Sequence, residues 1–316
     1  MRILMVAAVV AVLAMPGCRW LPRQGMGGLQ QVADLGYRPT IVRPTHASGQ
    51  GPRVAIDEAH HNFHTSEGRY KPFAELLRRD GYRVSANRKR LSMEVMREVD
   101  VLVIANALNQ ANENNWSPPF AAAFQSDEIH AVRQWVEQGG ALLLIADHAP
   151  FPAAVDPLAK AFGIEFCNCY AIAGQWKQGG ANTFALNNGL LASAITRGRD
   201  AKDQVTSVAT FTGSAFKLPP DATAVLRFGA GSTATERTLK PADQNQVRSF
   251  PISGWAQGAV MEVGQGKVAV FGEAAMFTAQ RIGSERFGMN HPTAGHNYRL
   301  LLNILRWLGG GKFLAN

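Results

Sequence analysis

The sequence predicts an α/β domain built on a doubly wound, mostly parallel sheet, with a hairpin added near the carboxyl end. Three observations predict it. Short apolar runs alternate with amphipathic segments from Arg53 onward, which is the pattern of strands joined by helices. Two of the runs, 100–108 and 141–146, are almost continuously aliphatic, as in parallel strands buried on both faces. The chain has 316 residues, of which 46% are hydrophobic, enough for a large core.

In the first half of the domain, the sequence pattern predicts alternating strands and helices. RVAI forms a strand that ends at Asp57, and YKPFAELLRRDG forms a helix that ends at Gly81. YRVSA and DVLVIANAL are the next two strands. Ser126 caps the helix DEIHAVRQWVEQGG, whose acidic first turn suits the helix dipole, and ALLLIA is the fourth strand.

The second half is less regular. TAVLRFGA predicts a strand, and GAVMEVGQGKVAVFG predicts a hairpin that turns at residues 264–266. HNYRLLLNILRWLGG predicts a closing helix with an inward leucine stripe. The polar stretch 230–253 is predicted to be a long surface loop.

The first 18 residues are typical of a lipoprotein signal peptide. Arg2 supplies an early positive charge, and the apolar run 3–15 is shorter than the roughly 20 residues of a membrane-spanning helix. The run ends in MPGC, which resembles the lipobox of bacterial lipoproteins, with Cys18 as the lipidated residue. Ordinary signal-peptide cleavage beside an incidental cysteine is the alternative.

The predicted lipid anchor and the segment after it indicate where in the cell the protein is expected. Residues 19–52 are rich in Pro, Gly and polar residues, so we expect a tether between the membrane and a domain that spans 53–312. The expected protein is periplasmic and lipid-anchored, and Arg19 after the cysteine favours the outer membrane.

The net charge of +8 raises the question of a nucleic-acid partner, since RRDGYRVSANRKR holds six basic residues in thirteen. Export and the lack of any zinc-finger, homeodomain or RNA-binding motif argue against one. A solvated basic face near anionic lipid or cell-wall polymer is the expected interpretation.

Cys167 and Cys169 leave three interpretations open. One residue between them makes a small, strained disulfide ring. A free pair or a minor metal contact is the second interpretation. The one that we favour is two small buried side chains on a strand, because free cysteine packs as an apolar residue.

Candidate chemistry gathers where the predicted strands end. Asp57, Asp147 and Glu273 each follow a strand-like run, and ligands of parallel α/β sheets bind at the carboxyl ends of strands. Histidines accompany these carboxylates, namely His60, His61 and His64 after the first strand, His148 after the fourth, and His291 and His296 after the hairpin.

Three interpretations of this cluster remain open. Asp57, His60, His61, His64 and His148 could bind a zinc-like divalent ion, with Asp147 or Glu273 as the base that activates water. Asp147 or Glu273 could instead orient a histidine as a metal-free general base. A hydrogen-bonded polar loop is the structural alternative. His60 and His61 are adjacent, so one is expected to point inward and the other to pack or face solvent.

Weaker candidates surround this cluster. Asn106 and Asn109 follow the third strand, and Arg69 and Tyr70 open a helix beside the histidines. The aromatic residues Trp116, Phe120 and Phe124 could line a sugar-binding rim, or could form an apolar flap over the sheet edge.

The order of elements in 53–165, with VRQW, Gly-Gly and LLLIADHAPF, resembles the glutamine-amidotransferase-like (class I) superfold. In particular it is similar to an uncharacterised exported and lipoprotein branch related to gliding-motility and transport-associated domains. GKVAVFGEAAMF and HNYRLLLNILRWL look like the usual carboxyl end of that branch.

The resemblance implies a nucleophilic cysteine at the elbow after the fourth strand, but this chain has IADHAP there. Ala146 or Asp147 stands at the cysteine position, so glutaminase activity has no nucleophile. A G-x-S-x-G elbow is also absent.

Two functions follow as expectations. The first is a metal-assisted hydrolase of the cell envelope, acting on an unidentified substrate. The second is a non-catalytic module that binds a glycan or a protein, which loss of the cysteine permits.

Overall fold

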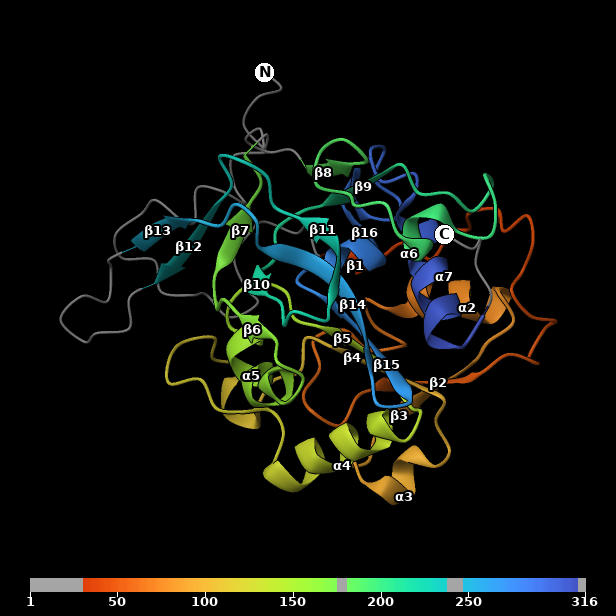
Figure 1. The fold of residues 1–316 in the computed structure, drawn as a ribbon, viewed down its shortest axis with the longest axis horizontal. Helices are drawn as coiled ribbons and strands as arrows, with labels where there is room; N and C mark the ends of the chain where they lie inside the picture. The colour runs from red at the N-terminus through yellow and green to blue at the C-terminus, as the bar shows by residue number, and fades with distance from the viewer. Residues whose placement is uncertain (1–30, 175–180, 238–246, 312–316) are drawn as a thin grey trace.

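A computed structural model describes residues 31–174, 181–237 and 247–311, and shows a mixed α/β fold around a nine-stranded sheet (Figure 1). Eight strands run in the order β3-β2-β4-β5-β15-β14-β10-β6, and β11 pairs with β14. Their bounds are β2 Arg53–Asp57, β3 Arg83–Asn87, β4 Val101–Ala105, β5 Ala141–Ile145, β6 Glu165–Phe166, β10 Phe216–Lys217, β11 Thr223–Arg227, β14 Ala256–Val263 and β15 Gly266–Phe271.

The five strands from β3 to β15 are parallel, as the aliphatic runs predict. β14 and β15 form the predicted hairpin around Gly264, which has a φ of +60° that suits glycine. From β14 outward the sheet is antiparallel. A large, mostly parallel central sheet is therefore confirmed, and its antiparallel flank departs from an ideal doubly wound sheet.

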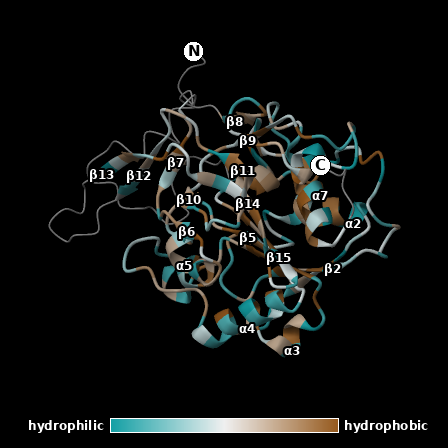
Figure 2. Cartoon of the chain, in the orientation of Figure 1, coloured by the Kyte–Doolittle hydropathy of each residue, from teal (hydrophilic) through white to brown (hydrophobic). Residues whose placement is uncertain are grey.

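Helices cover both faces of the sheet. Phe73, Leu76 and Leu77 of α2 (Lys71–Arg79) share one apolar cluster with the leucines of α7 (Asn297–Leu308). α4 (Ser126–Glu137) and α5 (Phe151–Ala161) belong to the cluster on the other face. In Figure 2 the central strands are mainly hydrophobic, and the visible side of α4 is mainly hydrophilic. The short helices are α3 Met93–Met96, η2 Gln110–Asn112, α6 Ala194–Arg197 and η4 Ala275–Phe277.

Part of the predicted loop 230–253 consists of strands, so that prediction was wrong. β12 (Thr233–Arg237) pairs with β13 (Val247–Pro251) and with β7 (Tyr170–Ile172). β8 (Asn182–Ala185) pairs with β9 (Ser207–Thr210), and β16 (Ala279–Ile282) pairs with β17 (Glu285–Gly288). Among the described side chains of β12, only Ala234 is buried against the core, so the strand leaves little hydrophobic pattern in the sequence.

Residues 31–52, expected to be part of a tether, pack against the domain instead. β1 (Val32–Ala33) pairs with β16, and the backbone N–H and the hydroxyl of Thr45 each donate to the Asp80 carboxylate at 2.7 Å. Partners this distant in the chain leave no local signal. Cys18 and the rest of the predicted signal peptide lie outside the described residues. None of the helices in the described residues has both the length and the hydrophobicity of a membrane-spanning helix.

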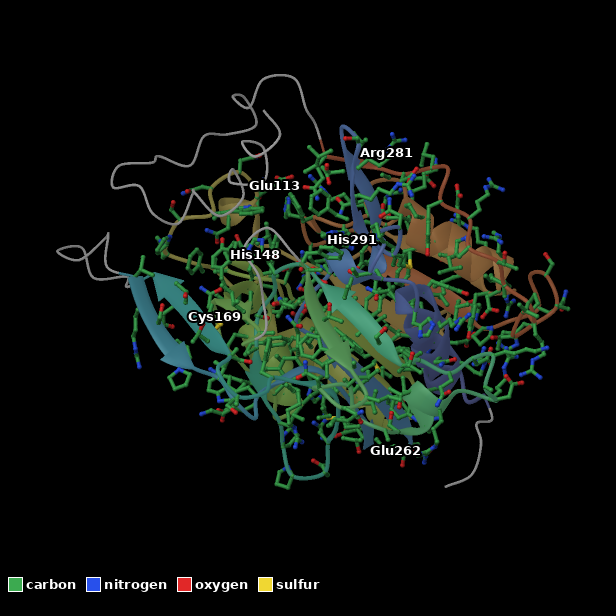
Figure 3. The ribbon with its side chains drawn as sticks, turned by 90° about the horizontal axis from the view of Figure 1, so that it is seen from above. Glu113, His148, Cys169, Glu262, Arg281 and His291 are labelled. Atoms are coloured by element: carbon green, nitrogen blue, oxygen red, sulfur yellow. A yellow bond between two sulfur atoms is a disulfide. The ribbon has the colours of Figure 1, made fainter. Side chains whose placement is uncertain are left out.

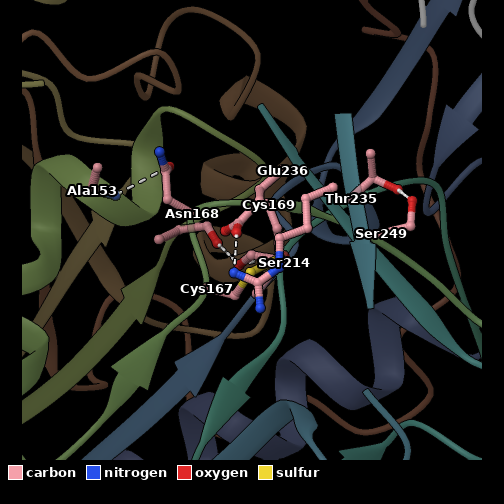
Figure 4. The surroundings of a disulfide bond; sticks show 11 residues. Ala153, Cys167, Asn168, Cys169, Ser214, Thr235, Glu236 and Ser249 are labelled. Carbon is pink, nitrogen blue, oxygen red and sulfur yellow. Dashed lines mark hydrogen bonds and ion pairs between the residues drawn. A yellow bond between two sulfur atoms is a disulfide. The ribbon is translucent and has the colours of Figure 1, made fainter. Parts of the chain in front are cut away.

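Cys167 and Cys169 are joined by a disulfide, with their Cα atoms 5.3 Å apart (Figure 4). Both side chains are buried, but they lie between β6 and β7 and are bonded to each other, so the prediction of two free cysteines on a strand was wrong. The Cys169 carbonyl accepts a hydrogen bond of 3.2 Å from the Ala149 N–H. The disulfide segment therefore supports the backbone just after His148.

Candidate functional site

The carboxyl ends of β2, β4, β5 and β15 meet, as the fold prediction requires. The Asn106 N–H, just after β4, donates to the Ile145 carbonyl of β5 at 3.0 Å, and the Ala146 N–H donates to the Phe271 carbonyl of β15 at 3.0 Å. These bonds hold the residues that follow the strands at one edge of the sheet.

His60 is clamped between two carboxylates. Its Nδ1 lies 2.8 Å from Asp57 Oδ2, its Nε2 lies 3.0 Å from Glu128 Oε1, and its side chain is buried. Burial opposes a charge on this imidazole, but the hydrogen bonds and charges of Asp57 and Glu128 outweigh it and raise the pKa of His60. With both nitrogens occupied, His60 joins the end of β2 to the start of α4.

Glu128 is a partner that the sequence analysis missed. It is the third residue of α4, and its Oε2 accepts the Gln125 N–H at 3.0 Å in a capping box. Its Oε1 also accepts the Leu91 N–H at 3.0 Å. Burial raises the pKa of this carboxyl, but the bonds from Gln125, His60 and Leu91 outweigh burial and lower it. The only sequence signal at Glu128 is its place in the first turn of a predicted helix. That place predicts a helix start, but it does not predict the contact with His60.

His61 faces away from the cluster. Its half-exposed ring contacts the Glu113 carboxylate at 3.1 Å, and its backbone has a φ of +45°. One of the two adjacent histidines thus points inward and the other outward, which confirms that prediction.

His64 is buried, and its protonation state can be deduced from its neighbours. The Asp147 N–H donates to Asn106 Oδ1 at 2.9 Å, which fixes the orientation of that amide. The Asn106 NH2 group, 3.2 Å from His64 Nδ1, must then donate to it. Burial, and then the charge of Arg69, hold the pKa of His64 well below its usual range. His64 is therefore a neutral imidazole with its proton on Nε2.

The two predicted catalytic carboxylates bind backbone groups. Asp147 accepts N–H groups from His148 at 2.8 Å and Ala274 at 3.1 Å, and Glu273 accepts the Met276 N–H at 2.6 Å. Within the described chain, neither is hydrogen-bonded to an imidazole. Burial, and then the Asp147 charge, raise the pKa of Glu273 well above its usual range. Asp147 thus joins the end of β5 to the residues after β15, and Glu273 stabilises the turn that follows β15.

Among the described residues, Nε2 of His148 has no hydrogen-bond partner. Its Nδ1 lies 2.8 Å from the Ala149 carbonyl, which can only accept, so the proton is on Nδ1 and the lone pair on Nε2. The ring stacks on Tyr170 with centroids 4.5 Å apart. In Figure 3, His148 lies between the labelled Glu113 and Cys169 along one side of the molecule.

Aromatic rings surround His148 and His64. We call Phe63, Trp116, His148, Phe151 and Tyr170 the aromatic patch. The Trp116 ring lies 5.2 Å from Phe63, 5.1 Å from Phe151 and 6.1 Å from His148, measured between centroids. Phe151 is buried, and the other four are half-buried at the surface.

Further side chains complete the surroundings of the patch. The Arg69 guanidinium lies 4.0 Å from the Phe63 ring centre, a cation–π contact. Phe124, predicted with Trp116 as a rim or a flap, is instead buried against the His60 ring at 4.3 Å. The aromatic segment thus divides between the surface and the core.

The predicted metal ligands do not form a ready site. Among the described residues, no group of three or more His, Cys, Asp or Glu side chains is placed to hold an ion. Both His60 nitrogens are occupied, His61 points away, and His64 would have to move its proton to Nδ1 and turn Asn106 to offer a lone pair. Asp57 is shared between His60 and the Asn87 amide.

We predict that Glu273→Gln stabilises the protein at neutral pH. A raised pKa means that the folded state holds the Glu273 proton more tightly than the unfolded chain does. The wild type therefore loses stability as pH rises above about 4.3, by up to ~1.4 kcal/mol per unit until the folded pKa is passed. Urea unfolding should show the variant equal to wild type near pH 4 and more stable near pH 7.

Glu262→Gln is the control for this prediction, because Glu262 is exposed on β14. Its stability should follow that of wild type at both pH values. If Glu273→Gln destabilises the protein near pH 7, then the Glu273 carboxylate is charged and bonded in the native state.

The chain matches no protein-family model and no curated protein sequence. Among solved structures it is similar to the mmIFT52 N-terminal domain, with a TM-score of 0.59, 16% identity and coverage of 83% of this chain and 100% of that one. A ThuA-like protein from Bacteroides uniformis has a TM-score of 0.43, 14% identity and coverage of 86% and 94%. A ThuA-like protein from Parabacteroides merdae has a TM-score of 0.45, 10% identity and coverage of 84% and 93%. At such identities the similarity concerns the fold alone, and the α/β fold is shared with the mmIFT52 domain.

Proposed function

We propose that this protein is a non-catalytic glycan-binding module of the bacterial cell envelope, on an amidotransferase-like superfold of the exported, gliding-motility and transport-associated branch. The strand order β3-β2-β4-β5-β15 supports the superfold. Lipidation at Cys18 and a periplasmic location are parts of the same proposal, supported by the apolar run that ends at that cysteine.

The residues at the elbow support a role without catalysis. On the proposed superfold, Ala146 or Asp147 stands where the nucleophile would be, and the Asp147 carboxylate already accepts two backbone N–H groups. Both ring nitrogens of His60 are hydrogen-bonded, whereas Glu273 accepts the Met276 N–H with one carboxylate oxygen and its other oxygen is buried without a hydrogen-bond partner among the described residues. A general base needs a lone pair that can reach a substrate, and Asp147, Glu273 and His60 are all buried.

The aromatic patch carries the glycan proposal. The half-buried His148 has an Nε2 lone pair that can accept a hydrogen bond. Sugar hydroxyls donate such hydrogen bonds. The half-buried Trp116 and Phe63 rings add apolar faces, which suit the C–H faces of a sugar.

The test is the binding of cell-wall glycan fragments, measured by calorimetry. We expect Trp116→Ala to weaken binding roughly 10- to 100-fold, the loss of about 2 kcal/mol typical of a central aromatic residue. Trp255→Ala is the matched control, because Trp255 is a half-buried tryptophan that packs on Phe250 and Lys217 instead. Binding that both variants retain, or no binding by wild type, would contradict the proposal.

A metal-assisted hydrolase is the second candidate, supported by one observation. His148 holds its Nδ1 proton on a carbonyl and directs a lone pair from Nε2, an arrangement common among histidine ligands. Elemental analysis of protein purified without a histidine tag separates the two functions. A stoichiometric ion that His148→Ala loses would favour the hydrolase over the binding module.

A further inference from the structure

A second surface feature lies away from the carboxyl edge of the sheet. A cavity of about 410 Å³ opens between the segment after β1 and the β16–β17 hairpin. Its lining includes three arginines, Arg38, Arg281 and Arg286, together with Asp34 and Asn290. We call it the arginine cavity. Figure 3 shows Arg281 at the outside of the molecule, well apart from His148.

The positive charge of this cavity is not balanced. Within the described part of the chain, none of the three arginines forms an ion pair at 4.0 Å or less. The single carboxylate of the lining, Asp34, accepts the Gly36 N–H at 3.3 Å and the Asn290 amide at 3.0 Å. Three arginines and a single carboxylate line the cavity, which leaves an excess of positive charge.

Two of the arginines oppose each other directly. Arg281 of β16 and Arg286 of β17 are partners in the antiparallel register. Like charges at such positions destabilise a strand pair, so an anion bound between the two guanidinium groups would relieve their repulsion. Guanidinium groups bind phosphate oxygens in a bidentate manner, which makes phosphate the anion of best fit.

Exposed apolar side chains lie beside this charge. Val32 is 48% exposed and Leu35 is 56% exposed, and Val32 is the register partner of Arg281. Arginines beside exposed aliphatic side chains are the composition that sits at the interface of an anionic membrane. Val32 also follows Cys18, the residue proposed to carry lipid, by only 14 positions.

We propose that the arginine cavity binds phosphate-type anions, and that its natural anion is the headgroup phosphate of an anionic phospholipid. Arg281 and Arg286 bind the phosphate, and Arg38 adds a third positive charge. Val32 and Leu35 contact the lipid surface. This site is independent of the aromatic patch, so the glycan proposal can fail without affecting it.

Vesicle co-sedimentation tests the lipid. The full chain with Cys18→Ser, which cannot carry the lipid, should bind vesicles of phosphatidylglycerol and phosphatidylcholine better than vesicles of phosphatidylcholine alone. Adding Arg281→Gln and Arg286→Gln should lower that binding roughly 30-fold. Adding Lys89→Gln and Arg97→Gln instead removes the same charge from exposed residues near α3, and should lower it far less.

Thermal unfolding tests the anion and the fold together. Inorganic phosphate should raise the Tm of the Cys18→Ser chain more than sodium chloride of equal ionic strength does, and should not do so once both arginines are replaced. Without phosphate, the arginine-replaced chain should be at least as stable as its parent, because the like-charge pair is gone. Lost binding then cannot be attributed to unfolding.

The outcomes decide between sources of the anion. If replacing the arginines abolishes vesicle binding, the headgroup proposal stands, whether or not free phosphate shifts the Tm. If only the phosphate shift disappears, the cavity binds a soluble phosphate compound and the lipid assignment is overturned. If neither measurement changes, the arginine cavity is no anion site.

Discussion

Replacing His60 with alanine is expected to lower the free energy of unfolding by about 3–5 kcal/mol near pH 6, because it leaves two buried carboxylates without their shared cation. Asp57 and Glu128 lie 2.8 and 3.0 Å from the two ring nitrogens, and both are buried. Urea unfolding measures the loss. The adjacent His61→Asn is the control, since that half-exposed ring contacts only Glu113 among the ion pairs of the described residues, and asparagine tolerates its positive φ.

The pH dependence of the stability loss in His60→Ala distinguishes the loss of the imidazolium charge from the loss of packing by the ring. His60 has a raised pKa, so its contribution is fully present below the unfolded value of about 6.5 and is lost as pH rises through the folded pKa. In His60→Ala the orphaned carboxylates can be neutralised by protons near pH 4, so the deficit should shrink there. A deficit that is the same at both pH values would mean that cavity formation, rather than charge, is responsible.

Replacing Asn106 with alanine is expected to cost about 3–5 kcal/mol, for two separable reasons. The Asn106 amide accepts the Asp147 N–H and donates to His64 Nδ1, and all three groups are buried. Its backbone also has a φ of +50°, where a residue with a Cβ is strained. Asn106→Gly removes only the hydrogen bonds and should therefore cost about 1–2 kcal/mol less than Asn106→Ala.

Urea unfolding of both variants measures these costs, and Asn115→Ala is the control because Asn115 is exposed and bonds only locally. Its effect should stay within about 0.5 kcal/mol. Equal stability of Asn106→Gly and wild type would mean that the amide does not join β4 to β5. His64 would then be free to change its tautomer.

Local pattern accounts for what could be predicted of the fold. The period of Phe73, Leu76 and Leu77 reflects one buried face of α2, and the aliphatic run of β4 reflects burial on both faces of the sheet. The turn at Gly264 depends on the conformation of a single residue. Each of these signals lies within a few neighbouring positions, so no tertiary information is needed to detect it.

The gathering of the site residues followed from the same reasoning. Asp57, Asp147 and Glu273 end or follow strands, and the ends of parallel strands share one edge. The chemical state of each residue did not follow. His60 binds Glu128 from 68 positions away, and His64 has its tautomer set through Asn106, 42 positions away.

By itself, the sequence determined the mostly parallel sheet, its covering helices and the edge where the polar residues meet, because each depends on local periodicity. Only the tertiary structure decided that residues 31–52 dock on the domain, that 233–237 and 247–251 are strands, and that the histidines are held by carboxylates and an amide. Those outcomes depend on hydrogen bonds between distant segments, and a polar side chain in a sequence carries no sign of which distant partner will satisfy it.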